Sequence, residues 1–160
     1  MKVRAVSGDE DWQWILEHAG PIGGAQVVSR GVLHTLQDHT ALLAEEDRQK
    51  LGFAVYRMEG SECELLAILA VDQWRGTGSL LLEAVVAEAR RAACNRVCLV
   101  TTNDNVDALR FYQKRGFRLN LLRVDAFDEV IRLKGLERQH PVLGHHAIPI
   151  RDEILLSRSL

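Results

Sequence analysis

The sequence predicts an α/β fold in which helices flank a mixed, mostly antiparallel central sheet. Short apolar runs bounded by polar turns dominate the first half of the chain, as is typical of strands. From residue 63 onward, strand patterns alternate with helix patterns. A strand-rich region followed by strand–helix–strand units indicates one sheet that is covered by helices.

In the first half, strands are expected at 2–6, 40–45 and 51–58, the last two joined by a polar turn at 47–50. The acidic run at 9–11 favours a helix start, because carboxylates are stabilised at the positive end of a helix. The glycine-bearing stretch 20–24 ends that helix. Residues 25–30 fit either a short strand or an extended loop, and residues 31–39 show no decisive pattern.

In the second half, strands are expected at 63–71, 96–102, 118 to about 124, and 150–157, with helices at 79–93, 105–117 and 125–134. The stretch 136–149 is rich in Arg, Gln, His, Pro and Gly, which predicts a loop. No repeat or long linker divides the chain, so we expect a single domain over residues 1–160.

The composition is that of a soluble protein, with 47% hydrophobic and 26% charged residues. A formal net charge of −2 gives no electrostatic reason to expect nucleic acid or an anionic membrane as a partner. No apolar run approaches the roughly 18 residues of a membrane helix. The N-terminal residues lack the apolar core of a signal peptide, so a cytoplasmic protein is expected.

The three cysteines, Cys63, Cys94 and Cys98, are an odd number and therefore a poor disulfide framework. No further cysteine and histidine set completes a zinc site with them. We therefore expect buried thiols and no bound metal. The adjacent His145 and His146 are expected in a solvated loop rather than in a metal pair.

A glycine-bearing turn joins the strand at 63–71 to the helix at 79–93. Such a turn exposes backbone N–H groups at the positive end of a helix, which suits a phosphate, and glycine permits close approach of the anion. The turn is not a Rossmann fingerprint, because the third glycine is missing, and it is not a P-loop, because no Gly-Lys-Ser/Thr follows. The candidate phosphate-binding residues are Gln73, Arg75, Gly76, Thr77, Gly78 and Ser79.

The stretch 105–117 has the pattern of a helix with one functional face. The polar residues 101–104 are expected to cap its start. Gly116 is expected to end it in a left-handed conformation, with Phe117 packing back over the end. A small residue between an amide and a phenol leaves room for a slender ligand, and residues three and four apart are helical neighbours. The residues of this face are Asn105, Ala108 and Tyr112.

Both patterns resemble motifs of the GCN5-related N-acetyltransferase (GNAT) superfamily. Gln73-x-x-Gly76-x-Gly78 is similar to its pyrophosphate loop, and residues 105–117 resemble its last cofactor-contacting helix. In one departure, only Asp72 separates the strand from Gln73, which leaves open whether Arg75 takes part of the role of Gln73. The tail at 148–156 resembles an ending found in a poorly characterised bacterial branch of the superfamily.

The resemblance implies a GNAT-like acyl-CoA N-acyltransferase fold, in which two parallel strands, here 63–71 and 96–102, splay apart around acetyl-CoA as co-substrate. It implies main-chain contacts to pantetheine from Ile68, Leu69 and Val71, and a contact from Asn105. It also implies that Tyr112 donates a proton to the leaving thiolate. The implied reaction is direct attack of a primary amine, carried by a small molecule or a peptide, on the thioester. A homodimer is compatible with the sequence.

The amine must lose a proton, because a lysine-like amine has a pKa of about 10.4. Glu64, near the start of the strand at 63–71, is the first candidate base. Strict alternation places it on one face with Leu66 and Ile68, and an unpaired carboxylate is costly to bury. We therefore expect Glu64 to face the cleft, although a merely solvent-facing carboxylate is equally compatible. The weaker candidates are Glu62, Asp72 and His34.

The acceptor site carries no recognisable motif. Trp12, Trp14, His34 and His39 could line it, although core packing is favoured for the tryptophans. The main alternative function is a non-catalytic acetyl-CoA-binding sensor or partner-binding module on the same fold, against which Tyr112 argues. A nucleotide-binding domain that uses the glycine turn for another phosphate is more distant, because the helix at 105–117 does not fit it.

Overall fold

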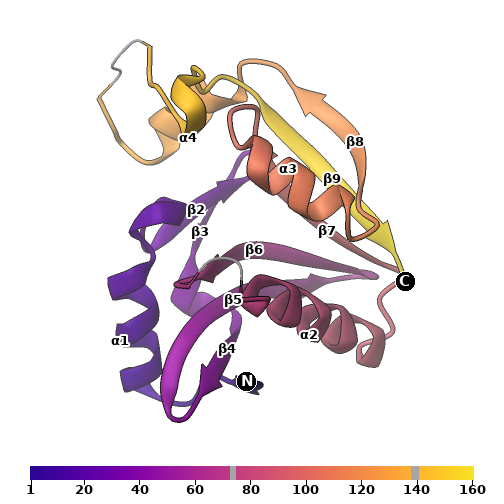
Figure 1. The fold of residues 1–160 in the computed structure, drawn as a ribbon. Coiled ribbons are helices and arrows are strands. Elements are labelled where there is room, and N and C mark those ends of the chain that lie inside the picture. The colour runs from indigo at the N-terminus through magenta and orange to yellow at the C-terminus, as the bar shows by residue number, and fades with distance from the viewer. Residues whose placement is uncertain (73–74, 138–140) are drawn as a thin grey trace. The chain divides into compact units, whose positions relative to one another are not determined.

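The computed structural model describes residues 1–72, 75–137 and 141–160, which form two compact units that we take one at a time (Figure 1). The first unit comprises Met1–Val27, His34–Val97 and Leu160, and the second comprises Val28–Leu33 and Cys98–Ser159. The short strands β2 (Gln26–Ser29) and β3 (Val32–Thr35) contain residues of both units, and they fall in the region where the sequence pattern was not decisive.

The first unit is built on antiparallel strands in the order β1, β4, β5, β6. These strands are β1 (Lys2–Ala5), β4 (Thr40–Glu46), β5 (Gln49–Glu59) and β6 (Glu62–Ala70). Tight turns join β4 to β5 and β5 to β6, and residues with positive φ lie in each of them. The strands predicted in these regions are therefore confirmed.

The strand β7 (Arg96–Thr102) begins in the first unit. The Asn95 N–H donates to the Ser61 carbonyl over 2.8 Å, and Arg96 forms an ion pair with Glu62. The starts of β6 and β7 therefore lie side by side, and strands that begin at the same end run parallel. One parallel pair beside antiparallel strands makes the sheet mixed, as the sequence predicts.

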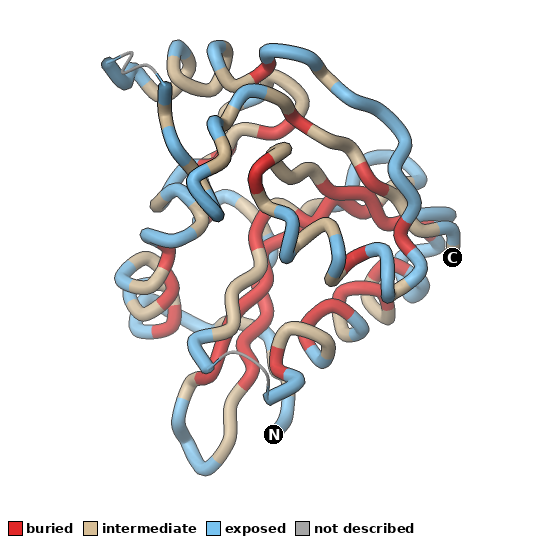
Figure 2. The backbone as a smooth tube through the Cα atoms, turned by 45° about the horizontal axis from the view of Figure 1, so that its top comes forward, coloured by how far each residue is buried: buried red, intermediate tan, exposed pale blue. Residues whose placement is uncertain are grey.

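Two helices, α1 (Asp9–His18) and α2 (Thr77–Arg91), cover opposite faces of this sheet (Figure 1). Alternate residues of the strands point to opposite faces. Ile15 of α1 packs with Leu43 and Phe53, which belong to one face. The apolar stripe of α2 is buried on the other face. Figure 2 shows that the central strands between the helices are mostly buried.

A bulge in β6 changes which residues share a face. Val55 pairs with Ala67, but Tyr56 pairs with Leu65, so Leu66 has no partner in the ladder. Glu64 therefore points to the same face as Ala67 and the α1 core. The predicted alternation, which grouped Glu64 with Leu66 and Ile68, is wrong for Ile68, because one extra residue reverses the parity of the strand, whereas Leu66 does pack against the α1 core.

The second unit contains the rest of β7, followed by β9 (Glu153–Ser159) and β8 (Arg118–Arg123), with β8 and β9 antiparallel. Its helices are α3 (Val106–Gln113) and α4 (Ala126–Leu133). Short 3-10 turns at Gly20–Ile22, Leu36–Asp38 and His145–Ala147 complete the described elements. Across the described ranges, no helix combines the length and the apolar character needed to cross a bilayer.

Two polar residues at the end of β7 hold the long loop before β9. The Asn103 Oδ1 accepts the Arg151 and Asp152 N–H groups at 2.9 and 3.0 Å, and its Nδ2 donates to the Pro149 carbonyl. The buried Asp104 accepts the His145 N–H over 2.8 Å. Because these side chains bind the loop, they do not cap α3, and the prediction that residues 101–104 supply the cap is wrong.

The start of α1 is tied to the sheet by one buried carboxylate. Asp11 accepts from the Arg4 guanidinium at 2.5 Å, from the Ser7 N–H at 2.9 Å, and lies 3.0 Å from the Lys50 ammonium. The hydrogen bond from Arg4 is the main reason that the pKa of Asp11 lies well below its usual range. The unit thus contains a carboxylate whose ionised form stabilises the fold.

We predict that Asp11→Asn lowers the free energy of unfolding by about 2 kcal/mol at pH 7, a value below that of a fully buried pair because Arg4 is partly exposed. A lowered folded pKa stabilises above the unfolded value of 3.8 and loses this contribution as the pH falls below it. Urea unfolding at pH 7 and pH 3 should therefore show a smaller difference at pH 3. Asp9→Asn, an exposed neighbour in the same turn, is the control; an equal loss there would assign the effect to the helix dipole.

Candidate functional site

The first part of the candidate site is the turn that connects β6 to α2. Gly76 is the N-cap of α2 and has a φ of 86°, in the left-handed region. A Cβ there would meet no atom within 4 Å, so the backbone conformation, and not space, requires glycine. The Leu80 N–H donates to the Gly76 carbonyl at 3.0 Å, while the N–H groups of a first turn have no acceptor within their own helix. Such N–H groups suit an anion, and phosphate binding by this turn stays a prediction.

The other predicted residues of the turn differ in what they present. The Thr77 side chain is buried and its hydroxyl lies 3.6 Å from the Met1 sulfur, so only its backbone can serve a ligand. Gly78 and Ser79 are half-buried in the first turn of α2. Gln73 and its neighbour Trp74 lie outside the described residues.

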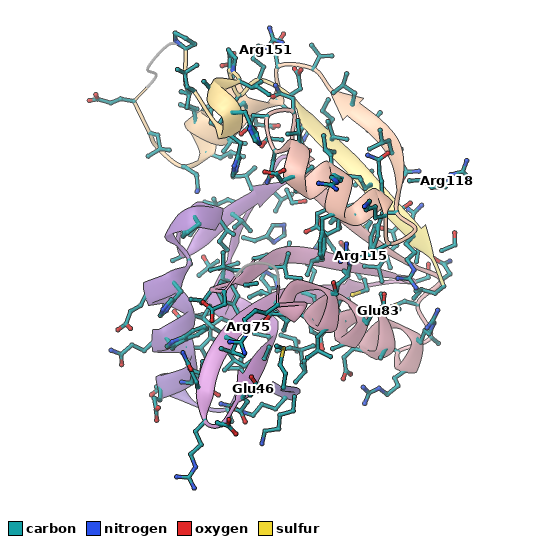
Figure 3. The ribbon with its side chains drawn as sticks, viewed as in Figure 1. Glu46, Arg75, Glu83, Arg115, Arg118 and Arg151 are labelled. Carbon is teal, nitrogen blue, oxygen red and sulfur yellow. The ribbon has the colours of Figure 1, made fainter. Side chains whose placement is uncertain are left out.

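Arg75 is the cationic side chain of this turn. It is half-exposed and forms ion pairs with Glu46 at 3.2 Å and with Asp72 at 3.4 Å (Figure 3). Both contacts are surface pairs, which are weak and readily exchanged. The guanidinium is therefore held beside the start of α2 by partners that an anionic ligand can replace.

At the end of β6, the backbone N–H and C=O groups point alternately toward β5 and away from it. The Val71 N–H donates to the Leu51 carbonyl at 2.9 Å, so Val71 faces β5. In an antiparallel ladder the direction alternates, so Leu69 also faces β5, while Ile68 and Ala70 face away from it. The predicted main-chain contacts therefore fit Ile68, whereas the Val71 N–H is already used within the sheet. Residues 68–70 are half-buried, unlike the buried start of the strand.

Glu64 lies on the α1 face of β6 and is almost fully buried, with 2% of its surface exposed. Its Oε2 accepts a hydrogen bond of 2.7 Å from the Arg57 Nε, and Arg57 also pairs with Glu59 at 2.6 Å. The expectation of an unpaired carboxylate facing the cleft or solvent is therefore replaced by a buried carboxylate with a guanidinium partner. The other carboxylate candidates also have partners, since Glu62 pairs with Arg96 and Asp72 with Arg75.

Sequence reasoning did not single out Arg57. A signal was present, because residues at equal distance from the turn at 60–61 face each other across a tight hairpin. Arg57 and Glu64 satisfy this spacing, and they are opposite each other in the structure. The pairing of a carboxylate with a guanidinium across the hairpin could therefore have been found from the register alone.

Two histidines lie on the same side of the first unit. The His34 ring is buried and stands edge-on to the His39 ring, with 5.2 Å between centroids. Burial, followed by the charge of Arg57, lowers the pKa of His39 below its usual value, while Asp38 and Glu64 act in the opposite direction. Trp12 and Trp14 pack against the core cluster, as the sequence favoured.

The predicted face of α3 belongs to the second unit. Asn105 is the N-cap of this helix, and its Oδ1 accepts the Ala108 N–H at 3.1 Å. The cap is thus Asn105 itself. The hydrogen bond uses its side-chain oxygen and leaves its side-chain NH₂ group outside this bond. Ala108 follows in the first turn and Tyr112 in the last, one helical turn apart.

Tyr112 is buried between two aromatic rings, with centroid distances of 5.1 Å to Phe111 and 5.6 Å to Phe117. Burial raises the pKa of Tyr112 above its ordinary value, so the phenol is neutral at pH 7. The Phe117 N–H donates to the Tyr112 carbonyl at 3.1 Å, and Gly116 has a φ of 84°. The left-handed helix end predicted from the sequence is confirmed.

All three cysteines are buried free thiols, as predicted. Within the described ranges, no group of three or more His, Cys, Asp or Glu side chains is arranged to hold a metal ion.

Comparison with known proteins places the chain in a family. Residues 10–117 match the family model described as Acetyltransferase (GNAT) family. The chain is 36% identical over 134 residues to the Bacillus subtilis protein YxbD, itself described as uncharacterized, and the match covers 84% of this chain and 82% of YxbD.

Two solved structures show the same fold. One is a Bacillus subtilis acetyltransferase in complex with CoA, with a TM-score of 0.74, 18% identity, and coverage of 99% of this chain and 98% of the other. The second is an IAA acetyltransferase from Bacillus cereus, with a TM-score of 0.75, 23% identity and 99% coverage of both chains. The predicted acyltransferase fold is thereby confirmed, and the chain belongs to the acetyltransferase (GNAT) family.

Proposed function

We propose that this acetyltransferase moves an acetyl group from acetyl-CoA directly to a primary amine of a small molecule or peptide. The observation that carries the proposal is the left-handed Gly76 turn, in which a half-buried strand end runs into the positive end of α2. A cytoplasmic location and a homodimer remain predictions from the sequence.

The donor is proposed to bind through the first unit by its pyrophosphate. The N–H groups of residues 76–79 at the start of α2 suit the phosphates, and Arg75 can exchange its surface carboxylates for them. The backbone of Ile68 and Ala70, directed away from β5, is suited to pair with the pantetheine amides. These contacts use main-chain groups, so they do not depend on the chemistry of the side chains at these positions.

Two side chains of α3 are proposed to act at the other end of the cofactor. With its oxygen bound to Ala108, the Asn105 amide can still donate its N–H groups to pantetheine or to a water molecule. Tyr112 is proposed to donate to the sulfur as the C–S bond breaks. A thiol has a pKa of about 8.5 and a phenol of about 10, so the phenol stabilises the thiolate first by a hydrogen bond.

The acceptor amine must be neutral when it attacks. A pKa of about 10.4 is over three units above neutral pH, a gap of roughly 4–5 kcal/mol. We propose that Glu64 supplies the negative charge that favours removal of this proton. Its support is that it is a carboxylate kept in place on β6 by the Arg57 guanidinium.

The simplest test is to measure free thiol release from acetyl-CoA with a panel of primary amines. If the protein transfers acetyl groups, the rate of thiol release should increase with one class of amine and not with the others. Binding of acetyl-CoA with equally slow release for every amine would favour the non-catalytic sensor.

Gly78→Asp should weaken acetyl-CoA binding at least tenfold, or about 1.4 kcal/mol, because it brings a carboxylate to the first turn of α2. Isothermal titration calorimetry on the folded variant measures this loss. Gly78→Ala adds a Cβ without charge and should lose less. Unchanged affinity in the Asp variant would show that the phosphates bind elsewhere.

Tyr112→Phe should lower kcat by about 10²-fold with little change in acetyl-CoA affinity, because a contact made only in the transition state is removed. Tyr56 is the matched control: it is the only other tyrosine, and burial raises its pKa to about 12, but it lies in β5 under α2. Tyr56→Phe should keep the parent turnover. If Tyr112→Phe reduced only the melting temperature, the phenol would be structural.

Glu64→Gln should slow turnover at neutral pH, and the residual rate should recover at high pH, where the amine is already neutral. The pH dependence of kcat/KM measures both effects. Glu62→Gln removes a carboxylate at the exposed start of the same strand and serves as the control. A profile for Glu64→Gln that superimposes on the parent profile would remove Glu64 from the mechanism.

A further inference from the structure

We infer that His39 is the first acceptor of the proton lost by the attacking amine, and that Glu64 stabilises the imidazolium that results. This inference rests on the proposed acetyl transfer to an amine. It assigns the two groups different roles, with the imidazole meeting the acceptor and the carboxylate acting through it.

The side chains of His39, Arg57 and Glu64 lie in one row across the sheet. Thr40 of β4 pairs with Tyr56 of β5, so continuing the register by one residue brings His39 opposite Arg57. Arg57 in turn pairs with Glu64 of β6. Residues directly opposite one another point to the same face of a sheet. The row His39–Arg57–Glu64 therefore runs over three neighbouring strand positions on the α1 face.

The two ends of this row differ in exposure. Glu64 is buried and bound to Arg57, so an acceptor amine would have to displace the guanidinium to reach it. His39, at the other end, is half-buried. Of the two groups in the row that could accept a proton, the imidazole is the more exposed.

The His39 ring is held by its surroundings. The His39 backbone is extended and follows the 3-10 turn Leu36–Asp38. Its backbone N–H donates to the Leu36 carbonyl at 3.1 Å. The buried His34 ring packs edge-on against it at an interplanar angle of 63°. A general base must lie within reach of the proton before its pKa matters. The hydrogen bond fixes the backbone of His39, and the His34 ring restricts the orientations of its imidazole.

The electrostatic surroundings suit a base at neutral pH. Burial and then Arg57 lower the pKa of His39, so the imidazole is neutral and can accept a proton at pH 7. Asp38 on its own turn and Glu64 on β6 raise the same pKa and thus favour the imidazolium once it forms. The buried His34 on β3 is a further titratable group in contact with the ring.

The proton and electron balance is simple. The amine nitrogen uses its lone pair to form the C–N bond, and the C–S bond breaks with its electron pair on sulfur. The amine proton passes to an imidazole nitrogen of His39, and the thiolate receives the Tyr112 proton. The imidazolium then loses its proton to solvent, from which the phenolate is reprotonated, so no further reactant is needed.

The experiment compares the pH dependence of kcat/KM for the parent, His39→Gln and Glu64→Gln, with thiol release as the readout. Removal of the imidazole should lower kcat/KM at pH 7 by about 10²-fold and abolish the limb produced by its titration. Removal of the Glu64 charge should lower the plateau of the profile, because the imidazolium is no longer stabilised, and should keep the limb but move it to lower pH, because Glu64 raises the pKa of His39. His18→Gln, which changes an imidazole stacked on Trp14, is the matched control and should keep the parent profile.

Nuclear magnetic resonance titration of the imidazoles provides a readout besides turnover. The His39 resonance should titrate below ordinary histidine in the parent and lower still in Glu64→Gln. A parent-like rate profile for His39→Gln, or a His39 titration that ignores Glu64→Gln, would overturn the inference while acetyl transfer stands. Absence of thiol release from the parent with every amine would overturn the proposed function and this inference with it.

Discussion

The antiparallel pairing of β5 with β6 is the constraint on which the first part of the site depends. At one end, the register sets Arg57 opposite Glu64. At the other end, a Cβ on Gly52 would overlap the Leu69 carbonyl oxygen and come within 3.0 Å of the Thr77 methyl group. A glycine in β5 therefore allows the end of β6 to lie close to the start of α2, beside the turn proposed to bind phosphate.

The same pairing creates the ion pair between Arg57 and the buried Glu64, which stability alone does not explain. Replacing a buried pair by apolar residues of similar volume is often neutral or stabilising, so such a pair is weak evidence of a stabilising role. Arg57 and Glu64 are better understood as a fixed arrangement of charge: the guanidinium orients the carboxylate, and the carboxylate is proposed to act on the His39 imidazole. The cost of desolvating Glu64 is offset by a hydrogen bond, as a buried charge requires.

Sequence patterns predicted most of the fold because its elements are locally consistent. The strand at 96–102 has the expected bounds, and the helix end at Gly116 adopts the expected left-handed geometry. The errors occurred where distant partners decide the structure. Asn103 binds the loop before β9 instead of capping α3, and periodicity along β6 does not reveal the bulge at Leu66, which sets the face of Glu64. The turn residues of the site could be predicted from the chain, whereas the partners of Glu64 depend on strand register.

Burial acts in opposite directions on the two neutral groups proposed for proton transfer. It raises the pKa of the Tyr112 phenol and lowers that of the His39 imidazole, because in each case the charged form is the one that loses solvation. The phenol therefore stays protonated and the imidazole unprotonated at neutral pH. Pairs of groups whose surroundings push their pKa values apart are the usual basis of an acid and a base acting at one pH. Here desolvation is the largest cause of both shifts, and for His39 the charge of Arg57 acts in the same direction.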